Sequence, residues 1–288
     1  RLREKIASVY DFPVENIIVG NGSDELLSMA LNCTAGPGNR VVFPTPSYSL
    51  FETLTRIQGA EAVPIELEDD FSLPPAFFSE QGALKMLASP NSPTGTVYPM
   101  EIIDRLAEEC DGILLLDEAY VDFSKESSLE LVRKYSNLLV TRTLSKSYSL
   151  AGLRVGYAFA QEEIIEGLMK VKDSYNLNRI SAAAAVAALE DQEYFRGNIQ
   201  LIRKERAALK NALEKMNFEV CPSGANFLLA RPPGGTARKI YEKLMAEKIL
   251  VRYFDLPRLN DCLRISIGTA EEMRLLIKTL SRILKEMF

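Results

Sequence analysis

Short apolar runs alternate with amphipathic stretches along the first 160 residues of the chain. Leu2, Ile6 and Tyr10 recur at helical spacing, so we expect the chain to open on a helix. Apolar runs of strand length follow, and helical stretches separate most of them: 17–19, 40–43, 60–65, 84–88, 113–117, 138–143 and 155–160. This alternation predicts an α/β fold with a largely parallel sheet.

The pattern changes after residue 160. Helical periodicity dominates 161–216, and a final helix is expected from Ala270 onward. We therefore expect two domains, a large one over residues 1–193 and a smaller α+β one over residues 194–288, with the boundary in or beside a long helix. Short strands are expected in the smaller domain at 227–230, 249–253 and 263–267.

Composition narrows the class of protein. The chain has 288 residues, 47% hydrophobic and 25% charged, as is ordinary for a globular protein. Its net charge of -5 and the lack of a long basic block argue against a nucleic-acid or anionic-membrane partner. The four cysteines are widely spaced, which argues against a zinc site and a disulfide framework and favours the cytoplasm. The sequence contains no histidine, so histidine-based catalysis and metal binding are excluded.

The beginning of the sequence gives a further expectation. The chain does not start with methionine and opens inside a helical pattern, so we expect that a preceding segment was removed or lies outside this sequence. Its first residues lack the apolar core of a signal peptide, and no apolar run is long enough to cross a bilayer.

Two polar side chains follow apolar strands at positions where open α/β sheets bind ligands. Asp117 ends the run 113–117, and a partly buried carboxylate there needs a cationic or hydrogen-bonding partner. Lys146 follows the run 138–143 among hydroxyl side chains. Most lysines are solvated surface charges, but this position favours an amine that forms an imine. Glu118 is expected to be a helix cap or a surface acid.

Arg154 follows Lys146 closely and completes a set of three chemical groups. A structural ion pair would explain it, but a planar guanidinium near hydroxyls also suits a phosphate. An amine, an acid that holds a ring nitrogen protonated, and a cation with hydroxyls for a phosphate are what pyridoxal 5'-phosphate (PLP) requires. The sequence therefore predicts a PLP site.

Three further segments are candidates, each with a plain structural alternative. The stretch 20–25 reads Gly-Asn-Gly-Ser-Asp-Glu before a helix, where backbone N–H groups attract phosphate, although a plain turn is equally expected. It lacks the third glycine of a dinucleotide fingerprint. Asn91 lies in the turn-like block 89–95 and offers an amide donor to a phenolate. Tyr48 would either pack in the core or stack on a flat cofactor.

Arg252 and Arg264 lie on expected strands of the smaller domain. An arginine within an apolar strand is costly unless it meets an anion. Both are therefore candidates for binding an anionic substrate, either a phosphate or a carboxylate.

With these motifs the chain resembles the fold-type I PLP enzymes, specifically the class I/II aminotransferases, and within them most closely the histidinol-phosphate aminotransferases. The resemblance rests on 20–25, 89–95, 117–120 and 145–156. It implies a large domain with a mostly parallel seven-stranded sheet and a small C-terminal domain. It also implies that Lys146 forms a Schiff base with PLP and that Asp117 pairs with the ring nitrogen. Asn91 and Tyr120 would bond the phenolic oxygen, and Tyr48 would stack on the ring. The resemblance further implies that the phosphate is surrounded by Gly22, Ser23, Asp24, Thr143, Ser145 and Arg154, and that the substrate's anionic end faces Arg252 and Arg264.

The resemblance implies transfer of an amino group from L-histidinol phosphate to 2-oxoglutarate, by a homodimer, in histidine biosynthesis. Members of the family carry an N-terminal arm before the first helix of this sequence, with a tyrosine that reaches the neighbouring subunit. Three alternatives stay open: a threonine-phosphate decarboxylase, an aromatic amino-acid aminotransferase, and a non-catalytic PLP-binding module. The residues alone leave the amino donor undetermined.

Overall fold

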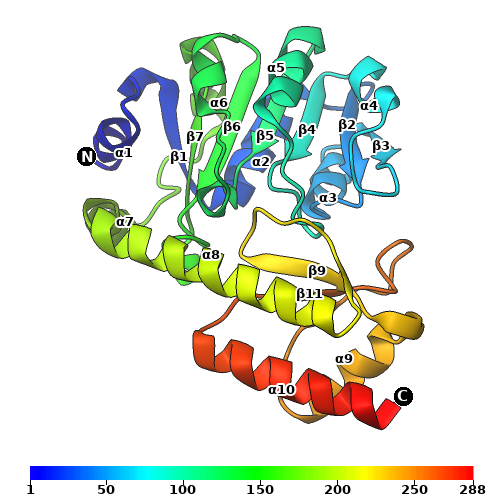
Figure 1. Cartoon of the computed structure of the whole chain (residues 1–288). Helices are drawn as coiled ribbons and strands as arrows, with labels where there is room; N and C mark the ends of the chain where they lie inside the picture. The colour runs from blue at the N-terminus through cyan, green and yellow to red at the C-terminus, as the bar shows by residue number, and fades with distance from the viewer. Residues whose placement is uncertain (288) are drawn as a thin grey trace.

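The seven strands expected in the first part of the chain form one sheet. The computed structural model describes residues 1–287 and orders this sheet β1-β7-β6-β5-β4-β2-β3 (Figure 1). Only β7 runs antiparallel to its neighbours, so the predicted α/β class with a mostly parallel sheet is confirmed. The strands are β1 (Ile17–Asn21), β2 (Arg40–Thr45), β3 (Glu61–Glu66), β4 (Leu84–Ala88), β5 (Ile113–Asp117), β6 (Leu138–Thr143) and β7 (Val155–Phe159).

Helices cover both faces of this sheet. One face packs against α1 (Leu2–Tyr10), α4 (Pro75–Ser79), α5 (Met100–Glu109) and α7 (Arg179–Glu190). The other face packs against α2 (Ser23–Thr34), α3 (Leu50–Ile57) and α6 (Glu162–Val171). Short 3-10 turns complete the connections: η1 (Val14–Asn16), η2 (Val121–Phe123), η3 (Leu129–Arg133) and η4 (Ala151–Leu153).

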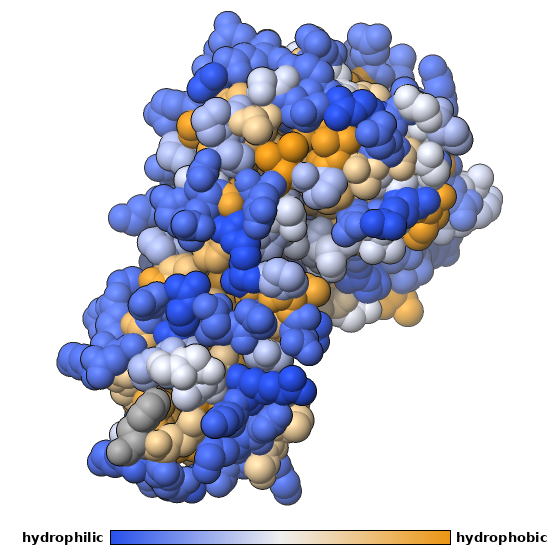
Figure 2. Space-filling model, turned by 90° about the vertical axis from the view of Figure 1, so that its right-hand side faces the viewer, coloured by the Kyte–Doolittle hydropathy of each residue, from blue (hydrophilic) through white to orange (hydrophobic). Residues whose placement is uncertain are grey.

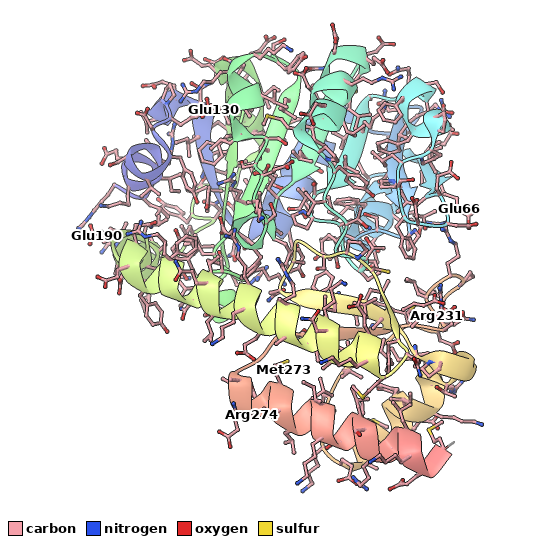
Figure 3. All side chains as sticks on the ribbon, in the orientation of Figure 1. Glu66, Glu130, Glu190, Arg231, Met273 and Arg274 are labelled. Carbon is pink, nitrogen blue, oxygen red and sulfur yellow. The ribbon has the colours of Figure 1, made fainter. Side chains whose placement is uncertain are left out.

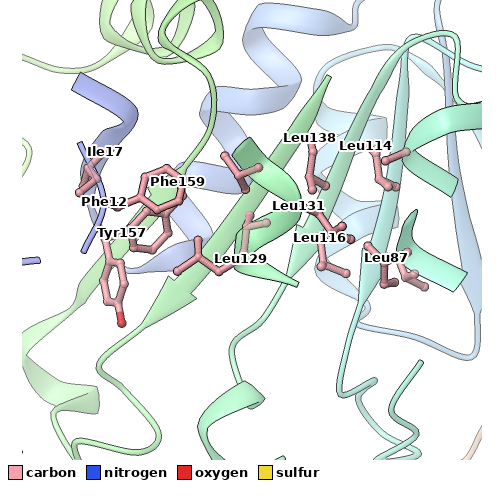
Figure 4. Close-up of a cluster of buried hydrophobic side chains, with 14 of the residues drawn as sticks. Phe12, Ile17, Leu87, Leu114, Leu116, Leu129, Leu131, Leu138, Tyr157 and Phe159 are labelled. Atoms are coloured by element: carbon pink, nitrogen blue, oxygen red, sulfur yellow. The ribbon is translucent and has the colours of Figure 1, made fainter. Parts of the chain in front are cut away.

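The central strands are apolar on both sides because both faces are covered. In β5, Leu114 and Leu116 point into the core on the α5 side, shown in Figure 4, whereas Leu115 points into the core on the α2 side. Successive side chains of a strand alternate between faces, so a strand buried on both sides reads as a continuous apolar run. The run ends at Asp117, where the strand reaches the carboxyl edge of the sheet.

The C-terminal part builds a second, antiparallel sheet with the order β10-β11-β9-β8. Figure 1 shows the long helix α8 running from α7 across the smaller sheet, and Figure 2 shows the molecule narrowing toward this smaller part. The elements are α8 (Gln192–Lys215), β8 (Glu219–Val220), β9 (Phe227–Arg231), η5 (Pro233–Gly235), α9 (Ala237–Ala246), β10 (Arg252–Tyr253), β11 (Leu263–Ser266) and α10 (Ala270–Met287). Leu213, Leu228 and Leu280 belong to its separate core.

Hydrogen bonds join the two parts at the ends of the sheets. Gly224 donates its backbone N–H to the carbonyl of Gly95 at 2.9 Å. Arg258 donates to the carbonyls of Leu67 and Glu68, just beyond β3. Figure 3 shows Glu66, at the end of β3, on the same side of the molecule as Arg231, at the end of β9.

The strands of the smaller sheet differ in part from expectation. The predicted strand 249–253 is reduced to Arg252–Tyr253, and β8 was not predicted. Each has two residues, which is too short for an alternating pattern to be recognised. Among the helices of residues 1–287, none has the length and apolar character to span a membrane.

Two glycines give a matched test of this packing. A Cβ added at Gly156 in β7 would lie 2.3 Å from the backbone nitrogen of Ser23, whereas one added at Gly197 in α8 would meet nothing within 4 Å. We expect Gly156→Ala to lower the free energy of unfolding by about 1–3 kcal/mol through overpacking. Gly197→Ala should raise it by about 0.5–1 kcal/mol through helix propensity. Urea titration measures both, and equal effects of the two variants would contradict this packing.

Candidate active site

A pocket opens at the carboxyl edge of the large sheet. The loops that follow β4, β5 and β6 contribute most of its wall, and the beginning of α2 closes one end. Its lining residues are Ser23, Asp24, Tyr48, Ala88, Pro90, Ser92, Asp117, Ala119, Tyr120, Thr143, Ser145, Lys146 and Arg154. The structure therefore brings together most of the residues that the sequence singled out.

Asp117 is the buried acid of this pocket, with 5% of its surface exposed. Its Oδ1 accepts hydrogen bonds from Thr141 Oγ1 at 3.1 Å and from the backbone N–H of Ala119 at 3.2 Å. Burial raises the pKa of Asp117 to about 6, although these bonds and the charge of Lys146 oppose the rise. Within residues 1–287 the carboxylate thus has no close cationic partner, and it faces the pocket.

The neighbouring Glu118 differs from expectation. It is 3% exposed rather than a surface acid or a helix cap, and its Oε2 accepts hydrogen bonds from Arg142 Nε at 3.0 Å and Nη2 at 2.6 Å. Glu118 Oε1 also accepts from the backbone N–H of Ser128 at 2.7 Å. The prediction for Glu118 was wrong because Arg142 lies 24 positions away, on the adjacent strand β6.

Lys146 and Tyr120 lie together on the wall. The Nζ of Lys146 is 5.2 Å from the centre of the Tyr120 ring, and the lysine is half-buried. The Tyr120 ring in turn meets Phe227 of β9 edge to face, with the centroids 5.1 Å apart. An aromatic contact therefore links the amine-bearing wall to the smaller domain.

The end of the pocket formed by Gly22, Ser23, Thr143, Ser145 and Arg154, here called the anion seat, can hold an anion. Gly22 precedes α2 with φ of 81°, and the first N–H groups of the helix, beginning at Ser23, face away from the intrahelical ladder. A Cβ on Gly22 would lie 2.4 Å from Arg154 Nη2, so only glycine leaves room for the guanidinium. The hydroxyl of Thr143 donates to Ser145 Oγ at 2.9 Å, and Arg154 Nη1 donates to the same oxygen at 3.4 Å.

Asp24 links this anion seat to Tyr48. Its Oδ2 lies 2.9 Å from Arg154 Nη2, and its Oδ1 accepts a hydrogen bond from the Tyr48 hydroxyl at 3.0 Å. Burial, followed by the nearby charge of Asp24, raises the pKa of Tyr48, so its hydroxyl stays protonated and keeps donating. The tyrosine ring is thereby held against the pocket.

Asn91 lies outside the pocket wall. Its side chain is fully buried and already bonded: it donates to Pro46 O at 3.1 Å and Thr94 Oγ1 at 2.9 Å, and accepts from Ser47 Oγ at 2.8 Å. The adjacent Ser92 lines the pocket instead. The sequence did not single out Ser92, because nothing in the residues of this turn indicates whether Asn91 or Ser92 faces the pocket.

The two arginines of the smaller domain stand side by side. Arg252 and Arg264 are register partners in the β10–β11 ladder. Arg264 Nη1 donates to Ser92 Oγ at 3.2 Å, which joins this arginine to the pocket wall, and its buried Nε has no hydrogen-bond partner. Burial lowers the pKa of Arg264, with Arg252 adding to the effect. Within residues 1–287 neither arginine forms an ion pair with a carboxylate, so the pair can receive an anion.

The donor set fits PLP. A flat ring between Tyr48 and the sheet would offer its nitrogen to the unpaired face of Asp117, and its phosphate would occupy the glycine-lined seat beside Arg154. No cluster of three or more metal-binding side chains exists among the described residues. A mostly parallel sheet that carries a lysine, a buried aspartate and an anion seat at its carboxyl edge defines the fold-type I class of PLP-dependent transferases.

Sequence comparison identifies the family. The model of "Aminotransferase class I and II" matches residues 1–280, and the chain belongs to that family. The chain is 44% identical over 284 residues to "Histidinol-phosphate aminotransferase 1" of Trichormus variabilis, covering 98% of this chain and 81% of that protein. It is also 44% identical over 282 residues to the histidinol-phosphate aminotransferase of Geobacter sulfurreducens, again covering 98% and 81%.

Solved structures give the same result. The chain matches the histidinol-phosphate aminotransferase of Sinorhizobium meliloti in complex with pyridoxal-5'-phosphate with a TM-score of 0.92 and 28% identity, over 100% of this chain and 82% of that one. A decarboxylase of Sulfurospirillum multivorans matches with a TM-score of 0.87 and 26% identity, over 98% of this chain and 86% of that one. These likenesses confirm the predicted fold-type I architecture.

The unpaired carboxylate of Asp117 gives a pH-dependent prediction for the cofactor-free protein. Its pKa is about 6 in the folded state and 3.8 ordinarily, a difference that corresponds to roughly 3 kcal/mol. Because the pKa of Asp117 is higher in the folded than in the unfolded protein, ionisation of this carboxyl destabilises the fold. The loss of stability is complete above about pH 6 and disappears as the pH falls to 3.8. We expect Asp117→Asn to raise the free energy of unfolding at pH 8, and the two proteins to converge near pH 4.

Chemical denaturation at a series of pH values measures this difference. The matched control is Asp111→Asn, because Asp111 is exposed and precedes the same strand. A stability gain for Asp117→Asn that is constant from pH 4 to pH 8 would show that ionisation of the carboxylate is not its cause.

Proposed function

We propose that this protein is a PLP-dependent aminotransferase that moves the amino group of L-histidinol phosphate to 2-oxoglutarate, in histidine biosynthesis. The single observation that carries the proposal is the pocket that Asp117 and Lys146 share, with an anion seat at one end. The arginine pair Arg252 and Arg264, bonded to the wall through Ser92, supports a phosphorylated substrate. The full-length similarity to histidinol-phosphate aminotransferases supports the choice of amino donor.

Each cofactor-facing side chain has a role that follows from its position. When bound, PLP supplies an aldehyde for the amino group and a ring that accepts electrons from the α-carbon. Asp117 would keep the ring nitrogen protonated. Its buried carboxylate is costly to ionise alone, and the positive charge of the protonated nitrogen would offset that cost. Tyr120 would donate its hydroxyl to the phenolic oxygen, and Tyr48 would hold the ring plane.

The anion seat would hold the cofactor phosphate. The proposed ligands are the backbone N–H groups at the start of α2, the hydroxyls of the turn after β6, and one guanidinium. These residues are Gly22, Ser23, Asp24, Thr143, Ser145 and Arg154. Asn91 would act through the shape of its turn, since both hydrogens of its amide are bonded within that turn.

Lys146 would move the protons of the reaction. Once its Nζ is free, it can take the α-proton of the substrate as general base and return it as general acid. Its position over the Tyr120 ring keeps the amine at the pocket wall. The sequence contains no histidine, so no imidazole competes for this task.

The assembly and location are also proposals. We propose a homodimer in the cytoplasm that acts on small molecules and binds neither nucleic acid nor membrane; the widely spaced cysteines and the net charge of -5 support the location and the partners. We further propose a large domain over 1–193 and a small domain over 194–288. The supporting observation is that α8 begins at Gln192 and its end packs in the separate core of the smaller sheet.

Decarboxylation of a phosphorylated amino acid is the second candidate function. The observation that favours it is the likeness to the decarboxylase of Sulfurospirillum multivorans, at a TM-score of 0.87. A panel of L-histidinol phosphate, threonine phosphate and phenylalanine, each with 2-oxoglutarate, separates the candidates. Glutamate formed from L-histidinol phosphate without CO2 supports the proposal, and CO2 released from threonine phosphate supports the alternative.

Removing the amine tests the central role of Lys146. We expect Lys146→Ala to lose turnover and the long-wavelength absorbance of lysine-bound PLP, because Lys146 carries the only amine among the described residues that line the pocket. Absorbance spectroscopy and single-turnover assays measure both. Lys170→Ala is the control, since Lys170 is exposed on α6. Retention of both signals in Lys146→Ala would refute the role.

Removing one guanidinium tests the substrate anion site. We expect Arg264→Gln to lower kcat/KM for L-histidinol phosphate by about 30-fold or more, because a lost charge-assisted contact costs about 2–5 kcal/mol. Arg274→Gln on the exposed face of α10 is the control, shown in Figure 3. Steady-state kinetics measure both variants. An Arg264→Gln effect as small as the control's would place the phosphate elsewhere.

A further inference from the structure

Two arginines of α8 hold the turn that follows Tyr120. Arg203 donates from Nε to Phe123 O at 3.3 Å and from Nη2 to Asp122 O at 3.1 Å, and it also bonds Ser124 O. Arg206, one helical turn further along α8, donates from Nη2 to Phe123 O at 3.2 Å. The carbonyls of Asp122, Phe123 and Ser124 therefore accept hydrogen bonds from two guanidiniums of the helix that leads into the smaller domain.

These two half-buried residues, here called the clamp arginines, differ in their partners from the buried Arg142. Arg142 has a carboxylate partner, whereas the clamp arginines have none within residues 1–287 and bond only to backbone carbonyls. Burial and the charge of Arg203 lower the pKa of Arg206, so its position is electrostatically costly. A planar fork can bond several divergent carbonyls at once, which an ammonium on a flexible chain cannot do as well.

The held turn connects two cofactor-facing residues. Tyr120 is the residue directly before η2. Within η2, Asp122 Oδ2 accepts a hydrogen bond from the hydroxyl of Ser147 at 2.5 Å, and Ser147 follows Lys146 in the sequence. A shift of η2 would therefore displace both the Tyr120 hydroxyl and the loop that carries the amine.

The clamp also reaches the substrate side of the pocket. Arg206 Nη1 donates to Ala225 O at 2.5 Å, two residues before Phe227. The Phe227 ring packs against Tyr120, with centroids 5.1 Å apart, and lies 5.0 Å from the guanidinium carbon of Arg264. One arginine thus fixes the large-domain turn and the small-domain strand that meet at Tyr120.

We propose that Arg203 and Arg206 are positioning residues, which set Tyr120 and Lys146 against the cofactor by fixing η2 to α8. This inference rests on the proposed PLP-dependent function. It assigns a role in that function to two residues that do not line the pocket. Because a displacement of about 1 Å at a reacting group costs up to about a hundredfold in rate, loosening η2 should act on turnover more than on substrate binding.

The test compares holoenzyme variants in the absence of substrate and in turnover. The pH midpoint of the cofactor absorbance change reports the surroundings of the lysine-bound cofactor, including the Tyr120 hydroxyl. We expect Arg206→Gln to shift this midpoint in the same direction as Tyr120→Phe and to lower kcat by about ten- to a hundredfold, with KM changed little. In the double variant the two shifts should be less than additive, because both act through Tyr120.

Two matched variants separate geometry from charge and stability. Arg206→Lys keeps the charge and loses the fork, so we expect it to behave like Arg206→Gln; full rescue by lysine would overturn the proposal. Arg196→Gln, on an exposed part of α8, should leave the midpoint at its wild-type value. A lowered melting temperature with an unchanged midpoint in Arg206→Gln would reduce the clamp to a stabilising contact.

Two further outcomes keep this test independent of folding and of the proposed function. If Arg206→Gln does not fold, Ser147→Ala breaks the same linkage at Asp122 while leaving α8 intact, and it should also shift the midpoint. No shift in that variant would overturn the linkage from η2 to the lysine loop. If wild-type protein shows no cofactor absorbance at all, the proposed function fails, and this result differs from every outcome expected for the variants.

Discussion

Two carboxylates meet at the end of β5, and the protein itself neutralises only one of them. Glu118 is paired with Arg142 across the β5–β6 ladder and receives a backbone bond besides. Asp117 is nearly as buried but has only two neutral donors, both on one oxygen. The cost of ionising it is therefore offset only when a cation enters the pocket, which couples the energetics of this strand to the bound cofactor.

The sheet topology decides what stands opposite that carboxylate. Strands β4, β5 and β6 run parallel, so the residues that follow them emerge at one edge of the sheet. Ser92, Tyr120 and Lys146 come from these three successive connections. The smaller sheet then closes the same edge through contacts of Arg264 with Ser92 and of Phe227 with Tyr120. Side chains of two different sheets therefore meet at one wall of the pocket.

Much of this arrangement could be predicted because it is local. Asp117 and Lys146 follow apolar runs that mark buried strands, and the carboxyl ends of parallel strands meet at one edge. Glu118 was predicted to be a surface acid or a helix cap because its partner, Arg142, lies on the next strand. A pairing between strands cannot be recognised from the residues around Glu118 alone. The same reason hid the clamp arginines, whose acceptors are carbonyls about 80 positions earlier.

The turn 89–95 shows a different kind of limit. Its sequence indicates a polar turn at a strand end, and two adjacent polar residues were equally able to face the ligand. The structure bonds Asn91 within the turn and leaves Ser92 on the pocket wall. Which of the two faces inward depends on the path of the backbone, and that path is fixed by distant contacts such as the bond from Gly224 to Gly95.

Arg154, which lines the pocket, and Arg264, which is bonded to its wall at Ser92, differ in what an arriving anion must displace. Arg154 already has a carboxylate partner, since Asp24 lies 2.9 Å from it, and both side chains are more than 40% exposed. Arg264 is half-buried, its buried Nε has no hydrogen-bond partner, and among the described residues it has no carboxylate partner; the exposed Arg252 stands beside it. A phosphate beside Arg154 would share this cation with Asp24. It would therefore gain mainly from hydrogen bonds with the backbone N–H groups at the start of α2. An anion beside Arg264 would give this half-buried guanidinium the partner that it lacks, so electrostatics favour an anion at this position.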